Sequence, residues 1–188
     1  MQQKNSSCFS VNRSAAAFII KTAIAATLVR VLYLFVLTDR NPCFACIGAV
    51  FGMGEEIIDG RITGGNRFYG TLLGGLTVLA VYPVYYGVHT ALAEILVLPL
   101  GLLIILLGGH LVHRTGIIQP ASVVYYVVLF TVATETFTSY TVARIIDTGL
   151  GVAISIGINV AWHAAQGYIA ARNNTAHAGG KITGGQTG

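Results

Sequence analysis

Apolar stretches that are candidates for membrane spans recur six times in this chain of 188 residues. They cover residues 15–37, 42–54, 68–86, 91–109, 118–134 and 146–165. The chain is 54% hydrophobic and only 10% charged, whereas a soluble domain carries about 25% charged residues. One small core cannot hide so much apolar surface from water. The composition therefore predicts a single all-α integral membrane domain with six transmembrane helices.

The lengths of these stretches set further expectations. Residues 68–86 make a helix of about 28 Å, which is enough to cross the bilayer. The second stretch starts at Pro42 and ends just before Glu55, so we expect it to be short or partly buried in protein. Residues 15–37 follow a polar start as a signal peptide would, but they show no clear cleavage site, and we interpret them as a retained first span.

Three regions follow from this pattern. Residues 1–14 form a polar N-terminal segment and residues 15–168 form the six-span domain. Residues 169–188 form a tail that is polar and rich in Asn-Asn and Gly-Gly pairs from Arg172 onward, and we expect this tail to be disordered.

Lysine and arginine residues set the expected orientation. With six spans both termini lie on one side, and that side collects Lys4, Arg13, Arg61, Arg67, Arg114, Arg172 and Lys181. The other side collects Arg40 and Arg144. The positive-inside rule therefore predicts cytoplasmic termini in a bacterial inner membrane.

A short motif occurs twice in the chain. Arg67, Thr71 and Gly74 match Arg144, Thr148 and Gly151, and the offset in the sequence is the same for all three pairs. This offset covers three spans, and three is odd, so the second copy enters the membrane from the opposite side. The motif predicts two inverted three-helix repeats, an arrangement that many transporters use with a substrate site between the halves.

The repeated motif suits the binding of an anion. Unpaired backbone N–H groups and a partial positive charge mark a helix N-terminus, and an arginine adds a full charge with five donors. Thr71 and Thr148 lie one turn further along and can each add a hydroxyl. Lys21 lies deep within the first apolar run, where a charged residue normally faces a bundle interior or a cavity. We therefore predict that five residues bind the substrate, namely Lys21, Arg67, Thr71, Arg144 and Thr148.

Glycines in the same motifs predict close helix packing. Gly70 and Gly74 have the GxxxG spacing, and Gly151 is the equivalent of Gly74 in the second copy. Without side chains at these positions, neighbouring helices can approach closely.

A structural explanation of each arginine stays open. Arg67 can sit at the cytoplasmic headgroups. Arg144 lies on the disfavoured side, where it can snorkel outward or pair with Asp147 or Glu135. An unpaired position facing lipid is excluded, because an arginine at the midplane costs about 2.5–3.5 kcal/mol on insertion scales.

Other classes of function find no support in the sequence. Cys43 and Cys46, and likewise His110 and His113, lack a third ligand nearby, so we expect no metal and no cofactor. There is no Walker loop, nucleophile elbow or catalytic carboxylate pair, so an enzyme is not expected. The net charge of +4 is spread without a basic block, which argues against nucleic acid as a partner.

Two segments resemble signatures of the fusaric acid resistance (FUSC) and aromatic acid exporter superfamily. GNRFYGTLLG, residues 65–74, resembles its G-x-N-R-x-x-G-T-x-x-G signature. ARIIDTGLG, residues 143–151, with Asn159 downstream, resembles its second signature, R-x-x-D-T-x-x-G. Lys21 also occupies a position where the family tends to carry a lysine. The resemblance covers most of residues 15–165, and plant aluminium-activated malate channels look like distant relatives.

The resemblance implies a six-helix domain that exports or conducts organic anions, often aromatic carboxylates, and that commonly assembles as a dimer or larger. Arg67 and Arg144 are the positions that would line its anion path. Many members carry a large soluble domain after the spans, whereas this chain has a short glycine-rich tail. The resemblance therefore implies that this chain works as a homo-oligomer or with a partner efflux subunit.

We expect an exporter of organic anions in the lipid bilayer. Two alternatives stay open at this point, namely a non-transporting membrane subunit of an efflux complex and a passive anion channel. The arrangement of Lys21, Arg67 and Arg144 around one cavity or at three separate interfaces discriminates between an exporter and a non-transporting subunit.

Overall fold

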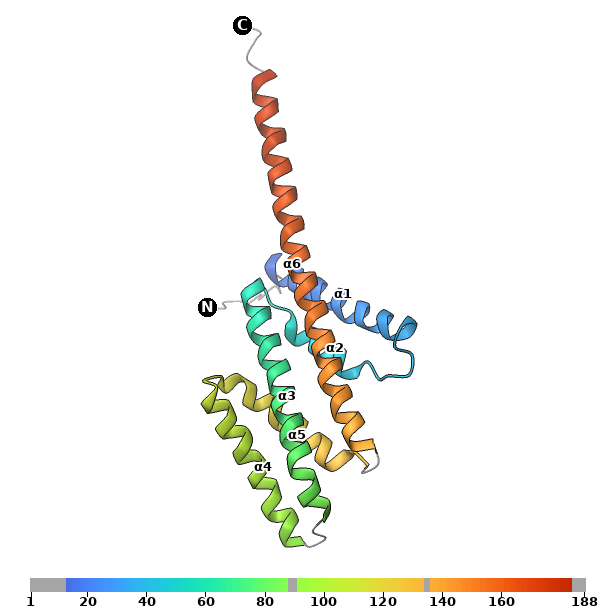
Figure 1. Ribbon diagram of the computed structural model, residues 1–188. Coiled ribbons are helices and arrows are strands. Elements are labelled where there is room, and N and C mark those ends of the chain that lie inside the picture. Colours follow the sequence, from blue (N-terminus) through green and yellow to red (C-terminus); the bar gives the residue numbers. More distant parts are fainter. Residues whose placement is uncertain (1–12, 88–90, 134–135, 184–188) are drawn as a thin grey trace, which may run out of the picture.

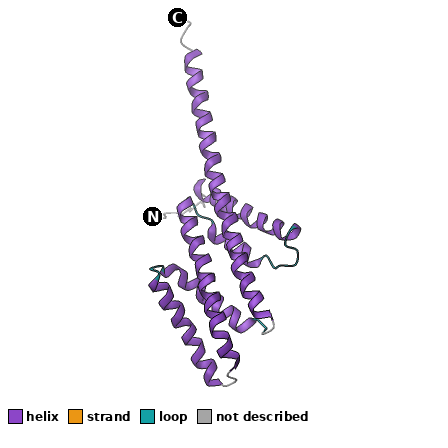
Figure 2. Ribbon diagram, viewed as in Figure 1, coloured by secondary structure: helices purple, strands orange, loops and turns teal. Residues whose placement is uncertain are grey.

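Helices make up nearly all of the computed structural model, which describes residues 13–87, 91–133 and 136–183 (Figure 1, Figure 2). The helices are α1 (Arg13–Phe35), α2 (Cys43–Gly52), α3 (Ile57–Gly87), α4 (Ala91–Leu111), α5 (Ile118–Thr131) and α6 (Phe137–Thr183), with the 3-10 turn η1 (Thr115–Ile117) before α5. No strand occurs within these described ranges, so the all-α prediction is confirmed. Nearly all of the expected N-terminal segment, residues 1–12, lies outside them.

Three of the described helices are long and apolar enough to cross a membrane: Ser14–Phe35, Ile57–Gly87 and Phe137–Ile169. The short helix α2 has 10 residues, or about 15 Å, which is half of a hydrocarbon layer of about 30 Å. The helix α5 has 14 residues and is also short for a span. Six complete spans are therefore not confirmed, although the second stretch is short, as the sequence predicts.

The two helices that carry the repeated motif form the centre of the bundle. Figure 1 shows that α3 and α6 run side by side in opposite directions, and they pack on each other. The helix α2 packs on α6 and α3, while α5 packs on α3. The helix α4 lies against α3 and α5, and α1 lies against α2 and α6.

Helix bounds follow the same offset as the motif. Shifting the bounds of α1, α2 and α3 by the offset from Arg67 to Arg144 gives 90–112, 120–129 and 134–164, close to α4, α5 and the first part of α6. The packing corresponds as well. The helix α3 contacts α5 and α4, and its equivalent α6 contacts their equivalents α2 and α1. The contact between α2 and α3 has no counterpart of similar extent between α5 and α6 in the described ranges. These relations fit an inverted repeat, but the inverted six-span topology is not confirmed.

Two apolar cores hold the bundle together. One includes Val78, Ile105 and Tyr125 and joins α3, α4 and α5. The other includes Ala25 and Ala45 and joins α1 and α2, with side chains of α6 packed against it. Each core thus belongs mainly to one side of the α3–α6 pair.

The end of α6 differs from the expected disordered tail. The helix continues to Thr183, and its last part extends away from the other helices in Figure 1. Extending an existing helix needs no new nucleation, and alanines after Ile169 favour the helical state. Residues 184–188 lie outside the described ranges.

Candidate functional site

The three basic residues that we expect to bind substrate are all buried. The exposed fractions are 2% for Lys21, 8% for Arg67 and 9% for Arg144. Each residue nevertheless lines a different pocket. The three side chains therefore do not share any of these pockets within the described ranges, and each one has to be considered in its own surroundings.

Lys21 is fully engaged by protein acceptors. Its ammonium donates to the side-chain oxygen of Asn159 at 2.7 Å and to the carbonyls of Gly54 and Glu55 at 3.2 and 3.4 Å. The amide of Asn159 donates in turn to the carbonyl of Glu56 at 3.0 Å. An ammonium has three donors, so none is left for a ligand. Lys21 joins α1, the α2–α3 turn and α6, which is a structural role.

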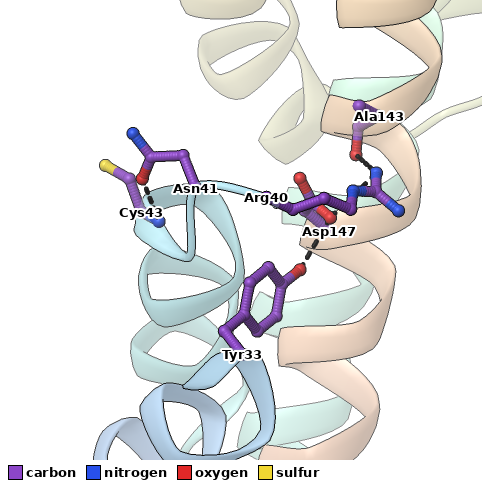
Figure 3. Close-up of polar contacts among 6 residues, drawn as sticks. All are labelled: Tyr33, Arg40, Asn41, Cys43, Ala143 and Asp147. Atoms are coloured by element: carbon purple, nitrogen blue, oxygen red, sulfur yellow. Dashed lines mark hydrogen bonds and ion pairs between the residues drawn. The ribbon is translucent and has the colours of Figure 1, made fainter. Parts of the chain in front are cut away.

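Asp147 on α6 is the centre of a second polar cluster (Figure 3). Its carboxylate pairs with Arg40 at 3.0 Å and accepts a hydrogen bond from the hydroxyl of Tyr33 at 2.6 Å. Arg40 also donates to the carbonyl of Ala143 at 3.2 Å. The cluster ties the end of α1 and the α1–α2 loop to α6.

Aromatic rings surround Arg144. The carbon Cζ of its guanidinium lies 3.4 Å from the ring centroid of Phe44 and 4.1 Å from that of Tyr140. The guanidinium also donates a hydrogen bond to the hydroxyl of Tyr140. Within the described residues no carboxylate pairs with Arg144, since Asp147 pairs with Arg40 and Glu135 lies outside them. The two rings stabilise the cation in place of a carboxylate.

Arg67 has the least protein contact of the three. Its guanidinium lies 5.2 Å from the ring centroid of Phe51. Its Nε atom is buried without a hydrogen-bond partner, and no hydrogen bond or ion pair of the guanidinium is found among the described residues. Burying a charged donor without a partner is unfavourable, so this side chain suits a ligand that supplies acceptors.

The pocket at Arg67, which we call the Arg67 pocket, has a volume of about 350 Å³. Its other lining residues come from α2, α3, η1 and α5, and they are Phe51, Thr63, Asn66, Gly116, Gln119, Pro120 and Val123. None of these lining residues is acidic. In contrast, the pocket at Lys21 includes Glu55, and the pocket at Arg144 includes Asp39 and Asp147. Of these three pockets, the Arg67 pocket is thus the one suited to an anion.

The start of α5 contributes to the Arg67 pocket. Gln119 and Pro120 lie in its first turn, and Gly116 lies in η1 just before it. A Cβ atom at Gly116 would lie 2.5 Å from the side-chain nitrogen of Asn66, so the glycine lets that amide approach the turn. The partial positive charge of a helix N-terminus adds to that of the arginine.

The two threonines do not line the pockets of their arginines. The hydroxyl of Thr71 donates to the carbonyl of Arg67 in its own helix at 2.9 Å. The hydroxyl of Thr148 is buried without a hydrogen-bond partner among the described residues, on the face of α6 that meets α2. Direct binding of substrate by these hydroxyls stays a prediction that the structure does not support.

The motif glycines lie where helices cross. A Cβ atom at Gly74 would overlap the carbonyl of Ala121 on α5, and one at Gly151 would overlap the carbonyl of Ala45 on α2. Gly70 also faces α5. The two copies of the motif therefore pack on different short helices, which correspond to each other at the offset of the motif.

Several residues of these sites were not among those expected from the sequence. Phe44 and Phe51 lie about two turns apart on α2, and each faces one motif arginine. The partner of Asp147 is Arg40. The sequence offers one signal for this pair, because Arg40 is predicted to lie on the same side of the membrane as Arg144, which is one turn from Asp147. The aromatic pair has no such signal, because phenylalanine is common in apolar runs.

Comparisons with known proteins address the identity of the chain. The family described as fusaric acid resistance protein-like matches residues 24–158. No curated protein matches the chain, and no solved structure matches it either. The distant similarity to plant malate channels is not confirmed. The family match covers α2 to α5, about half of α1, and the part of α6 that carries the second motif, and so the chain belongs to the fusaric acid resistance protein-like family of membrane proteins.

Proposed function

We propose that this protein transports small organic anions, including aromatic carboxylates, across the bacterial inner membrane and that the anion binds in the Arg67 pocket. Family membership supports a role in membrane transport or resistance. The substrate and the site are our proposals, and they rest on the surroundings of Arg67.

The observation that carries the proposal is a buried guanidinium without a described acceptor, in a pocket without an acidic lining residue. A carboxylate can accept two parallel hydrogen bonds from an arginine. Side-chain amides of Asn66 and Gln119 offer further donors, while Phe51 and Val123 offer apolar surface. The volume of about 350 Å³ falls within the range of small-molecule pockets.

A route between the two motif arginines is part of the proposal. Phe51 near Arg67 and Phe44 near Arg144 mark the two ends of α2, about 10 Å apart along the helix. An anion would move along this face of α2 from one arginine to the other. Phe51 is about half exposed. An anion on this face would meet lipid unless another subunit covered it, which is our reason to propose a homo-oligomer or a partner efflux subunit.

The inverted repeat and the orientation also belong to the proposal. The opposite directions of α3 and α6 in Figure 1 support two inverted halves. The excess of basic residues on one side supports cytoplasmic termini. In a cysteine-free background, single cysteines at positions 3 and 180 should escape an impermeant thiol reagent in intact cells, while one at 89 should react. Labelling at either terminus would contradict the orientation.

Uptake by purified protein in liposomes tests the central claim. We expect Arg67→Gln to lower the uptake of benzoate at least tenfold, because one charge-assisted hydrogen bond is worth about 1.5–3 kcal/mol. Arg61→Gln is the matched control, since Arg61 is an exposed arginine on the same helix. Uptake that is equal in both variants, at equal reconstitution, would refute the assignment of the site.

One observation favours a second candidate function. Lys21, Arg67 and Arg144 line separate pockets, as expected for a non-transporting membrane subunit that docks onto an efflux complex. Under this alternative, wild-type protein reconstituted alone shows no benzoate uptake above empty liposomes, while Arg67→Gln still folds.

A further inference from the structure

A second groove, separate from the Arg67 pocket, lies between α3 and α4. We call it the α3–α4 groove. Its volume is about 420 Å³, and it is lined by Tyr69, Leu72, Leu73, Leu76, Gly108, Val112, Arg114 and Ile117. Apart from Arg114, which carries the only charge among them, these lining residues are apolar or aromatic. The groove thus combines an apolar trough with a single cation.

Arg114 is held at one end of this trough by the turn that ends α4. His113 adopts a left-handed conformation with φ of 53°, and the backbone N–H of Arg114 donates to the carbonyl of Gly109 at 3.0 Å. This turn places the guanidinium over the ring of Tyr69, with Cζ 5.7 Å from the ring centroid. No acceptor or carboxylate contacts the Arg114 side chain within the described ranges.

The trough extends away from this charged end along α3. From Tyr69 to Leu76 the helix advances by two turns, or about 10 Å. Gly108 on α4 keeps the trough open, because it places no side chain over Leu73, and a Cβ atom there would lie 3.3 Å from Cδ1 of Leu73. A chain of methylene groups fits such a surface, whereas a compact polar solute does not.

We propose that the α3–α4 groove binds an anionic phospholipid, with its phosphate at Arg114 and one acyl chain along the leucines. The guanidinium lacks a described counter-charge, which favours a lipid with net negative charge over a zwitterionic one. The orientation predicted from the basic residues places Arg114 in the cytoplasmic leaflet, where anionic lipids give a negative surface potential. Tyr69 beside it suits the headgroup region, where tyrosine is enriched.

A free organic anion is a poorer occupant of this groove. The Arg67 pocket offers amide groups that can orient a small anion, whereas the α3–α4 groove offers leucines and one cation. The proposal therefore does not depend on the transport function, and the two can fail separately.

Native mass spectrometry of the full chain, with phosphatidylglycerol and phosphatidylcholine supplied at equal concentration, tests the charge requirement. We expect the wild type to retain phosphatidylglycerol about fivefold more than phosphatidylcholine, which corresponds to about 1 kcal/mol for one basic residue near the membrane surface. Arg114→Gln should abolish this preference. Arg61→Gln should keep it, because Arg61 is also exposed but lies outside the groove.

A second variant tests the apolar part of the groove. Leu76 is 55% exposed, so Leu76→Trp can fill the trough without disturbing the core, and size-exclusion chromatography checks that it folds. We expect this variant to lose both lipids. The proposal is overturned if the wild type shows no preference, if Arg61→Gln loses as much preference as Arg114→Gln, or if Leu76→Trp binds lipid as the wild type does.

Discussion

Arg67 and Arg144 occupy equivalent positions in the two copies of one motif, yet their surroundings differ. Arg144 lies against two aromatic rings beside a carboxylate that Arg40 already neutralises. Arg67 has one ring at a distance and no described acceptor. Both arginines face α2, but Arg144 also has Tyr140 of its own helix and the α1–α2 loop beside it, whereas Arg67 has a pocket at the start of α5. A repeated motif thus sets equivalent backbone positions, while the neighbouring helices decide whether an arginine stabilises the fold or is available to a ligand.

The largest effect is expected where the two copies are most alike. Gly151→Leu and Gly74→Leu should each prevent folding, because a side chain at either glycine overlaps a backbone carbonyl of a short helix. Gly157→Leu is the control on α6, since a Cβ atom there meets no other heavy atom within 4 Å. Detergent-extracted protein examined by size-exclusion chromatography provides the measurement. A monodisperse peak at wild-type level for Gly151→Leu would show that the α2–α6 crossing adapts to larger residues.

A smaller effect is expected from Asp147→Asn, on the side of Arg144. The substitution removes the charge that Arg40 and Tyr33 contact, which should lower the free energy of unfolding by about 2 kcal/mol. Arg67→Gln should leave thermal stability close to that of the wild type, because no described residue bonds to its guanidinium. The comparison fails if thermal unfolding in detergent shows a greater loss for Arg67→Gln than for Asp147→Asn.

Arg144→Gln distinguishes a structural arginine from one that lines a path. Loss of the contacts with Phe44 and Tyr140 should cost about 1–2 kcal/mol of stability. We expect benzoate uptake per folded molecule to fall less than in Arg67→Gln, because on the proposed route Arg67 binds the anion and Arg144 only guides its passage. Unchanged uptake per folded molecule would contradict the route along α2, and a fall equal to that of Arg67→Gln would show that both arginines bind the anion.

The smallest effects are expected at the threonines. Thr71→Val removes a hydrogen bond to the carbonyl of Arg67 and should cost up to about 1 kcal/mol. Thr148→Val replaces a buried hydroxyl for which no described residue is a hydrogen-bond partner, so it should leave stability unchanged or raise it. Thermal melts of the two variants in one detergent provide the measurement. A clear loss in Thr148→Val would reveal an acceptor outside the described residues.

Much of the helical order follows from the sequence, because apolar runs and the need to pair every backbone group leave few choices. The burial of Lys21 and the short second helix can be predicted in this way, and the family can be predicted from the two arginine motifs. The separate pockets of the three basic residues cannot be predicted, since they depend on which helices pack together. The pairing of Asp147 with Arg40 rather than Arg144 depends on the path of a loop, and hydropathy does not determine that path.

The shortness of α2 has a consequence for how the proposed transport would respond to membrane voltage. Over most of the bilayer the voltage falls across a hydrocarbon layer of about 30 Å. At α2 the helix is only 10 residues long, and polar backbone and charged side chains lie at both of its ends. On the proposed route, with water reaching both ends of α2, the voltage would fall over about 15 Å. A monovalent anion moving from one end of α2 to the other would then cross most of the voltage, and this movement is worth about 2.3 kcal/mol per 100 mV.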